Sequence, residues 1–545
     1  MRFKGLGLVV LAACGGGAAD SAGGDPTPGG NVGFGGAQDI GEFRGILERG
    51  EIPGPNTLDA NGFFNEHFNA PPDVTCGGPL CLTPGLSVGR DFLTGAHQAT
   101  LQISVNTTVN PLEHPRLPMK LSVVVDHSGS MAEDNRLEKV KVGLHALIDQ
   151  LSDEDRLSII SFDDTVTLDQ PFTSTLDRER LHFVVDNLRP DGGTNIFDGL
   201  KAGLDQLGET VENEKQNRVI LLSDGLATAG NTSQEAIIEM ATGYVSKGIG
   251  LTTIGVGDSF DVELMRGLAE RGAGNFYFVE DASAATEVFT EEVDVFMSPI
   301  ALDLQITAAT STGWQMGGVV GTKQWRAGAA SGDMTVPAVF FASRTSQTGE
   351  IGRRGGGSMI FINLDPSAAA AGTVADLKLS YRLPNTNEII THTVTLDYDR
   401  PPTEAVEEPF LSYAEMAERF AMYNTFLGFR LATQMAAEGD YNCAMSVLST
   451  TRSSAQSWNA SHENDPDIAA DLELADLFIA NLRAHGADSE FALSSCPAAE
   501  NPVSGEGEWN PDTGYNHPMA CSSGRGNASW LLILGALLVI RRRRR

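Results

Sequence analysis

The spacing of apolar residues changes along the chain and predicts its main structural units. Apolar and polar residues alternate between residues 99 and 109. Leu101, Ile103 and Val105 then share one side, which is the two-residue period of a half-buried strand. The same alternation returns far downstream, in residues 302–306, 377–381 and 392–398. We therefore expect a small β-domain whose strands lie on both sides of an intervening segment.

The intervening segment, residues 118–296, has a different pattern. Continuous apolar runs, such as residues 121–125, alternate with amphipathic helical patterns, such as residues 137–151. Continuous runs are typical of strands buried on both faces, which occur where helices cover both sides of a mostly parallel sheet. The predicted fold class is α/β. Its doubly wound, mostly parallel sheet is inserted into, or flanked by, the small β-domain and is followed by a C-terminal helical region.

Helical patterns lie near both ends of the chain. One short pattern places Phe43, Ile46 and Leu47 on one face and stops at residues 50–53, Gly-Glu-Ile-Pro. After residues 401–402, Pro-Pro, the chain becomes helical. Two apolar stripes follow there at helical spacing, in residues 416–435 and 468–482. Such stripes form cores far more often than ligand grooves, so we assign them no ligand.

The N-terminus is typical of an export signal. Arg2 and Lys4 form a positive region before the short apolar stretch of residues 5–13. This stretch ends in Leu-Ala-Ala-Cys, which resembles a bacterial lipoprotein box. In that interpretation Cys14 is acylated and becomes the new N-terminus. An ordinary secretory signal with a chance cysteine is the alternative.

The C-terminus predicts a second attachment. Residues 530–540 are apolar and precede five arginines. As a helix they would rise about 16 Å, short of the ~30 Å hydrocarbon core of a bilayer. With Cys521 in a small-residue motif just before, they resemble the Cys-containing, three-part sorting signal of myxobacteria and their relatives. A plain tail anchor with a basic cytoplasmic end is the alternative. We expect export to the bacterial cell envelope, outer membrane or cell surface, with membrane attachment by lipid, by this segment or by both.

Low-complexity segments mark the boundaries between the predicted units. Residues 15–38 and 497–527 are rich in small and polar residues and have no apolar period, as linkers do. The predicted units are a signal peptide (1–13), a flexible tether (14–38), an N-terminal helical extension (39–70), a flanking β-domain (71–117 plus 297–400), the α/β domain (118–296), a helical region (403–496), a linker (497–527) and an apolar segment with a basic tail (528–545).

The charge of the chain excludes one class of partner. The 545 residues include 38 basic and 71 acidic residues, a net charge of −33, while the 41% hydrophobic content is ordinary for a globular protein. A negative field repels phosphate backbones, so we expect no nucleic-acid binding. The same field attracts divalent cations, although a well-solvated surface explains it equally well.

The cysteines predict disulfides. Apart from the two cysteines in the terminal signals, the chain has Cys76, Cys81, Cys443 and Cys496. In an oxidising compartment four cysteines permit three connectivities. We expect the pair Cys76–Cys81, because Gly-Gly-Pro between them makes a tight loop, and by elimination the pair Cys443–Cys496.

Oxygen-bearing side chains follow three predicted elements of the α/β domain. The strand at residues 121–125 runs directly into Asp126, Ser128 and Ser130, spaced D-x-S-x-S. Thr194 lies in a Gly-rich loop, and Asp224 ends another buried strand. Ligands bind at the carboxyl ends of strands in doubly wound sheets, where these segments can converge. Two carboxylates and three hydroxyls suit Mg²⁺, Mn²⁺ or Ca²⁺ and do not suit zinc or copper.

This set of residues resembles the metal-ion-dependent adhesion site of von Willebrand factor A domains, and the similarity covers about residues 118–296. More loosely, the flanking segments resemble an exported bacterial subgroup with an N-terminal extension and a helical C-terminal region. The resemblance implies that Ser128 and Ser130 ligate the metal directly and that Thr194 does so directly or through water. Asp126 and Asp224 would ligate directly or through coordinated waters.

The resemblance also implies a function. Neutral hydroxyl ligands leave the cation under-neutralised, so its open position would take a Glu or Asp carboxylate from an unidentified partner protein. We therefore expect a non-catalytic binding protein acting in adhesion or envelope assembly. Two alternatives stay open: a structural envelope protein whose metal only stabilises the fold, and a hydrolase with an unrecognised catalytic site.

Overall fold

The computed structural model describes residues 30–496, apart from residues 71, 73–75, 110–116, 210, 212–214, 258–259, 291–298, 343–353, 366–370, 385, 387, 401–407, 463 and 489–490. The predicted signal peptide, the linker and the basic tail lie outside the described residues, as do Cys14 and Cys521. Of the helices in the described ranges, none combines the length and the apolar character needed to cross a membrane.

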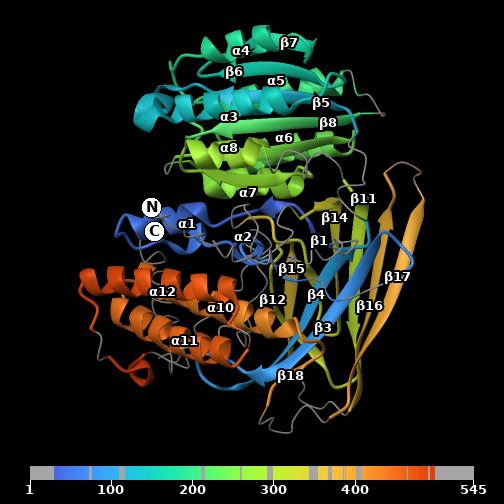
Figure 1. Ribbon diagram of the computed structural model, residues 1–545, viewed down its shortest axis with the longest axis vertical. Coiled ribbons are helices and arrows are strands. Elements are labelled where there is room, and N and C mark those ends of the chain that lie inside the picture. Colours follow the sequence, from blue (N-terminus) through green and yellow to red (C-terminus); the bar gives the residue numbers. More distant parts are fainter. Residues whose placement is uncertain are drawn as a thin grey trace, which may run out of the picture.

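A seven-stranded sheet forms the upper part of the molecule (Figure 1). Its neighbouring strands are all parallel except for β6 and β7, which are antiparallel. In spatial order the strands are β2 (Gly36–Ala37), β10 (Asn275–Val279), β9 (Ile249–Val256), β8 (Gln216–Ser223), β5 (Met119–Asp126), β6 (Arg156–Phe162) and β7 (Val166–Ser174). The antiparallel edge strand β7 makes the sheet mixed, as many doubly wound sheets are.

Helices cover both faces of this sheet. Val123 and Val125 of β5 are buried in one core, and Val124 between them is buried in the other. The first core includes α3 (Arg136–Gln150), α4 (Arg178–Asp186) and α8 (Ala282–Thr290). The second includes α5 (Ile196–Gly208), α6 (Gln234–Val245) and α7 (Val262–Arg271). This arrangement confirms the predicted doubly wound α/β fold and explains why the strands are continuously apolar.

An antiparallel sheet of eleven strands forms a second layer, around its own apolar core. Its strands are β12 (Gln315–Val320), β15 (Met359–Asp365), β4 (His97–Thr107), β1 (Gly30–Gly33), β14 (Ser331–Phe341), β11 (Ala301–Thr310), β16 (Gly372–Arg382), β17 (Ile389–Tyr398), β3 (Leu80–Arg90), β13 (Arg326–Ala327) and β18 (Phe410–Leu411). Strands from both sides of the α/β segment share this sheet. It is larger than the small β-domain that alternation alone indicates.

The prediction of a flexible tether over residues 14–38 is wrong for its last part. Strand β1 pairs with β4 and β14 of the large sheet, and β2 pairs with β10 at the edge of the seven-stranded sheet. Gly35 between them has φ +83°, and a Cβ there would lie 2.6 Å from the carbonyl oxygen of Gly274. The glycines therefore permit a close approach of two backbones, which composition alone cannot distinguish from flexibility.

The helical region packs on the N-terminal extension. Its helices are α10 (Met416–Ala437), α11 (Tyr441–Ser461) and α12 (Pro466–Ala484), and the extension contributes α1 (Gly41–Glu48) and α2 (Ala60–Asn65). Phe43 of α1 is fully buried, with its ring edge-on to Phe429 of α10 and Phe478 of α12. In Figure 1, α1 and α2 lie between the α/β domain and these three helices.

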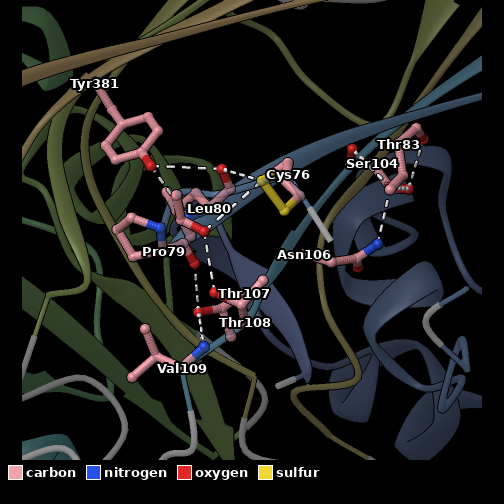
Figure 2. Close-up of a disulfide and its surroundings, with 12 residues drawn as sticks. Cys76, Pro79, Leu80, Thr83, Ser104, Asn106, Thr107, Thr108, Val109 and Tyr381 are labelled. Carbon is pink, nitrogen blue, oxygen red and sulfur yellow. Dashed lines mark hydrogen bonds between the residues drawn. A yellow bond between two sulfur atoms is a disulfide. The ribbon is translucent and has the colours of Figure 1, made fainter. Parts of the chain in front are cut away.

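Both expected disulfides are present, between Cys76 and Cys81 and between Cys443 and Cys496. The first lies beside the start of β3, where the hydroxyl of Tyr381 accepts a hydrogen bond from the Leu80 N–H at 3.1 Å (Figure 2). The second ties the start of α11 to the short 3-10 turn after α12. Each bond therefore fixes a chain segment at the border of a packed unit.

Candidate metal centre

Asp126 is the last residue of β5, at the carboxyl edge of the seven-stranded sheet, and its side chain is fully buried. One carboxylate oxygen accepts a hydrogen bond from the Ser128 N–H at 2.9 Å, and the other accepts one from the Ser223 hydroxyl at 2.6 Å. These two bonds fix the carboxylate from both sides. Asp126 is therefore held in one orientation at the point where the loop leaves the sheet.

The two serines of the motif join Asp126 to the next strand. The hydroxyls of Ser128 and Ser130 lie 3.1 Å apart, and Ser130 donates to the carboxylate of Asp224 at 2.9 Å. Asp224 directly follows β8, the neighbour of β5, and is fully buried. The parallel register of the two strands thus brings residues nearly a hundred positions apart into one hydrogen-bonded chain.

Thr194 reaches the same place from a loop that precedes α5. Its N–H donates to the hydroxyl of Thr228 at 3.0 Å, and its carbonyl accepts from the N–H of Thr228 at 3.0 Å. A Cβ placed on Gly225 would lie 3.4 Å from the Thr194 hydroxyl oxygen and 3.9 Å from that of Ser130. The two hydroxyls therefore face the same point beside Asp224. The structure brings all five predicted metal-site residues together.

Arg136, at the start of α3, also contacts this centre, and the sequence analysis did not identify it. Its guanidinium donates to the carboxylate of Asp224 at 3.0 Å, and its side chain is 5% exposed while that of Asp224 is 0% exposed. A Cβ on Gly257 would lie 2.5 Å from Arg136 Nε, so this glycine leaves room for the arginine. The one available signal was an arginine six residues after the last serine of the motif. Its burial could not be read from the residue type.

Burial raises the pKa of Asp126 to about 6, against the opposing hydrogen bonds from Ser223 and Ser128 and with a smaller contribution from the nearby Asp224 charge. The charged form is therefore costly in this pocket. A cation beside the carboxylate would favour the charged form and lower that pKa.

The donor chemistry fits a divalent cation. Asp126, Ser128, Ser130, Thr194 and Asp224 present oxygen atoms, the ligands that Mg²⁺, Mn²⁺ and Ca²⁺ take in proteins. The two carboxylates are buried, and the guanidinium of Arg136 lies against one of them. Arg136 compensates one of the two negative charges, so a divalent ion would leave the site with a net positive charge and would have an open position for one more oxygen ligand. The five side chains would hold and orient the ion, and Arg136 fixes the carboxylate of Asp224.

Comparison with known proteins identifies the α/β domain. Residues 121–291, about a third of the chain, match the family model for the von Willebrand factor type A domain. The fold described above is of this type, extended by the large β-sheet and the helical region. The chain therefore contains a von Willebrand factor type A domain, and such a domain indicates a protein-interaction or adhesion type of role.

Several relatives share this domain. The chain is 28% identical over 198 residues to an uncharacterized protein of Synechocystis sp., covering 36% of this chain and 46% of that protein. It is 26% identical over 195 residues to the uncharacterized protein YfbK of Escherichia coli, covering 36% and 34%. It is 29% identical over 192 residues to human inter-alpha-trypsin inhibitor heavy chain H3, covering 33% and 21%. The chain thus spans less than half the length of these curated relatives.

Among solved structures, a von Willebrand factor type A protein from Catenulispora acidiphila is similar with a TM-score of 0.48 and 14% identity. That similarity covers 71% of this chain and 88% of the other.

Proposed function

We propose that this chain is an exported protein of the bacterial cell envelope whose von Willebrand factor type A domain binds a partner protein through a divalent cation. Asp126, Ser128, Ser130, Thr194 and Asp224 hold the cation, which is Mg²⁺ or else Mn²⁺ or Ca²⁺. Its open position takes a Glu or Asp carboxylate of the partner. No bond is made or broken in this role, and the terminal cysteines and the C-terminal apolar segment supply membrane attachment.

The proposal rests on one observation: five oxygen-bearing side chains from three separate segments meet at the carboxyl edge of β5 and β8. Hydroxyls neutralise a cation less than carboxylates do, so the bound ion keeps affinity for an anionic ligand. A partner carboxylate satisfies that need, and metal removal abolishes the interaction.

Calorimetric titration tests the cation site directly. Mg²⁺, Mn²⁺ and Ca²⁺ are titrated into the metal-stripped exported chain and into the Asp126→Ala and Thr194→Ala variants. We expect saturable binding that both substitutions weaken. Asp149→Asn, an exposed carboxylate on α3, is the matched control and retains binding. Absence of Mg²⁺, Mn²⁺ and Ca²⁺ binding to the folded chain would overturn the proposal.

A structural role is the second candidate, and one observation favours it. The chain of hydrogen bonds from Ser128 through Ser130 to Asp224 is closed by Arg136, so the loops already hold one another. In that case Asp126→Ala lowers thermal stability but leaves partner binding unchanged after correction for the folded fraction. Chemical crosslinking of the envelope in Mg²⁺ and in EDTA, with wild type and Asp126→Ala, distinguishes the two roles.

A further inference from the structure

A second group of ionisable side chains lies far from the von Willebrand factor type A domain, where the N-terminal extension meets the helical region. His67 follows α2, Glu418 lies on α10, and Asp467 and Asp471 lie on α12. His67 is 0% exposed, and Asp467 and Asp471 are each 2% exposed. One ligand atom from each of His67, Glu418 and Asp467 lies within 4.8 Å of the other two.

The two ring nitrogens of His67 face different carboxylates. Nε2 lies 3.0 Å from Asp471 Oδ2, at hydrogen-bond distance. Nδ1 lies 3.4 Å from Glu418 Oε1, at ion-pair distance, but within the described residues neither atom makes a hydrogen bond. When Asp471 accepts from the Nε2–H group of a neutral imidazole, the lone pair of Nδ1 points toward the Glu418 oxygen. Two acceptors that face each other in a buried place need a positive charge between them.

The loop that carries His67 is held firmly. The side-chain amide of Asn69 donates to the carbonyls of Phe64 and His67 at 2.8 and 3.0 Å. That of Asn31, from β1, donates to the carbonyl of Asn69 at 2.6 Å. The Phe68 N–H donates to the carboxylate of Asp467 at 2.8 Å. The imidazole is therefore fixed in place before any ligand arrives.

The nearest cation along α10 is directed elsewhere. Arg419 follows Glu418 directly, but its guanidinium donates to the hydroxyl of Tyr413 and to the carbonyl of Ala70, each at 2.7 Å. Two buried carboxylates, of Asp467 and Asp471, and the partly buried carboxylate of Glu418 thus lie around one imidazole. A divalent ion offsets more of this negative charge than a single proton on Nδ1 does.

We propose that His67, Glu418 and Asp467 form a second, buried metal site that takes a divalent transition-metal ion such as Zn²⁺. An imidazole nitrogen with two carboxylates suits Zn²⁺ and disfavours Mg²⁺ and Ca²⁺, which prefer oxygen ligands throughout. Asp471 is the positioning residue: a carboxylate on the distal nitrogen fixes the tautomer of a ligating histidine. The ion joins the N-terminal extension to α10 and α12, and its binding is coupled to folding.

The experiment uses the exported chain in a background that removes two other places where Zn²⁺ can bind. Asp126→Ala disables the site of the proposed function. His145→Gln disables a half-exposed pair on α3 and α4 in which the Nδ1 atoms of His145 and His182 lie 2.6 Å apart. This background protein is unfolded, freed of metal and refolded with or without Zn²⁺, because the site is buried. Bound zinc and the thermal midpoint are then measured.

We expect one zinc per chain and a higher midpoint. Glu418→Gln loses both effects, while Glu473→Gln, the same substitution at an exposed position on α12, keeps them. Asp471→Asn weakens zinc binding about 10–100-fold, as is typical when a carboxylate that hydrogen-bonds a ligating histidine is replaced. If Glu418→Gln fails to fold, Asp467→Asn serves as the second test. It also loses zinc, yet it keeps an acceptor for the Phe68 N–H. A Co²⁺ absorption spectrum reports the ligand field independently of stability.

Two outcomes would overturn the proposal. One is a folded background protein that binds no zinc, which would mean that His67 is held as imidazolium by Glu418 and Asp471. The other is zinc retained by both Glu418→Gln and Asp467→Asn. Neither outcome bears on Mg²⁺ binding at the first site, because that site is tested by its own variants.

Discussion

At the scale of single residues, Arg136 compensates the negative charge of the buried Asp224. A buried ion pair that loses one partner typically costs about 3–5 kcal/mol, because the other charge stays uncompensated. We therefore expect Arg136→Met to lower the free energy of unfolding by about that amount in metal-free protein. A divalent cation beside Asp224 should restore part of the loss. Urea unfolding with EDTA and with Mg²⁺ measures both effects.

Arg136→Lys is the control for this prediction, since it keeps the charge and loses the planar donor arrangement. An equal loss of stability with and without Mg²⁺ would mean that no cation reaches Asp224. That result would count against the proposed metal centre as well.

A second residue-scale prediction concerns pH. Glu270 on α7 lies against β2, where a Cβ on Gly36 would be 3.5 Å from its Oε1. Burial raises the pKa of Glu270, partly offset by Lys323. The folded state then binds this proton more tightly than the unfolded state, so stability falls as the pH rises from about 4.3, the ordinary pKa of glutamate, through the raised value. Glu270→Gln should therefore be more stable than wild type at pH 8, by a margin that shrinks toward pH 5.

Urea unfolding at several pH values measures that margin. Glu263→Gln, at an exposed position on the same helix, is the matched control and should show no such gain. A constant margin across the pH range would contradict the assignment to Glu270.

How much of the candidate site could be predicted depends on the residue. Asp126, Ser128 and Ser130 have a recognisable spacing at the end of an apolar run, and Thr194 and Asp224 each lie next to an equally plain pattern. Their meeting follows from the parallel order of strands, and the structure brings them together. Ser223 and Arg136 could not be found in this way. Their contribution depends on hydrogen bonds across the sheet, which residue type and spacing do not encode.

At the scale of elements, periodicity predicted the long buried patterns best. The run at residues 121–125 corresponds to β5, which has both faces in a core. The stripe at residues 416–435 corresponds to α10, which has its apolar face in a core. Strand β7 was not foreseen, because its residues are mostly exposed or half-buried and carry little apolar signal. Strands β1 and β2 are buried, but they were missed because they are short and rich in glycine.

The two disulfides differ in the length of chain that they close, and this predicts different effects on stability. Cys443 and Cys496 are 53 residues apart, whereas Cys76 and Cys81 are 5 apart. In the chain-entropy model a longer loop gives a larger stabilisation, about 4 kcal/mol against about 2 kcal/mol here. Replacing both members of each pair by serine should therefore destabilise more at residues 443 and 496. Urea unfolding of the two double variants, with reduced wild type as reference, measures the difference.

At the scale of the whole molecule, the segment from β1 to β2 joins the two sheets. A Cβ at Gly35 would clash with the Gly274 carbonyl, and the positive φ there costs other residues about 1–2 kcal/mol. Gly35→Ala should therefore loosen β2 from β10, with faster amide exchange in β10 and lower stability. Gly33→Ala is the matched control, because a Cβ there meets no atom within 4 Å. Equal exchange in the two variants would contradict this role.

The position of the metal centre also determines how a pulling force would pass through the molecule. Asp126 lies at one end of β5, and the described chain enters the domain at the other end of that strand. A ligand pulled away from the centre would therefore load β5 along its length. Since β6 and β8 flank β5 in parallel register, their hydrogen bonds would resist together in shear, whereas a hairpin opened from its end yields one pair at a time. The pairing of β5 with both neighbours would thus resist unfolding when the metal centre is under tension.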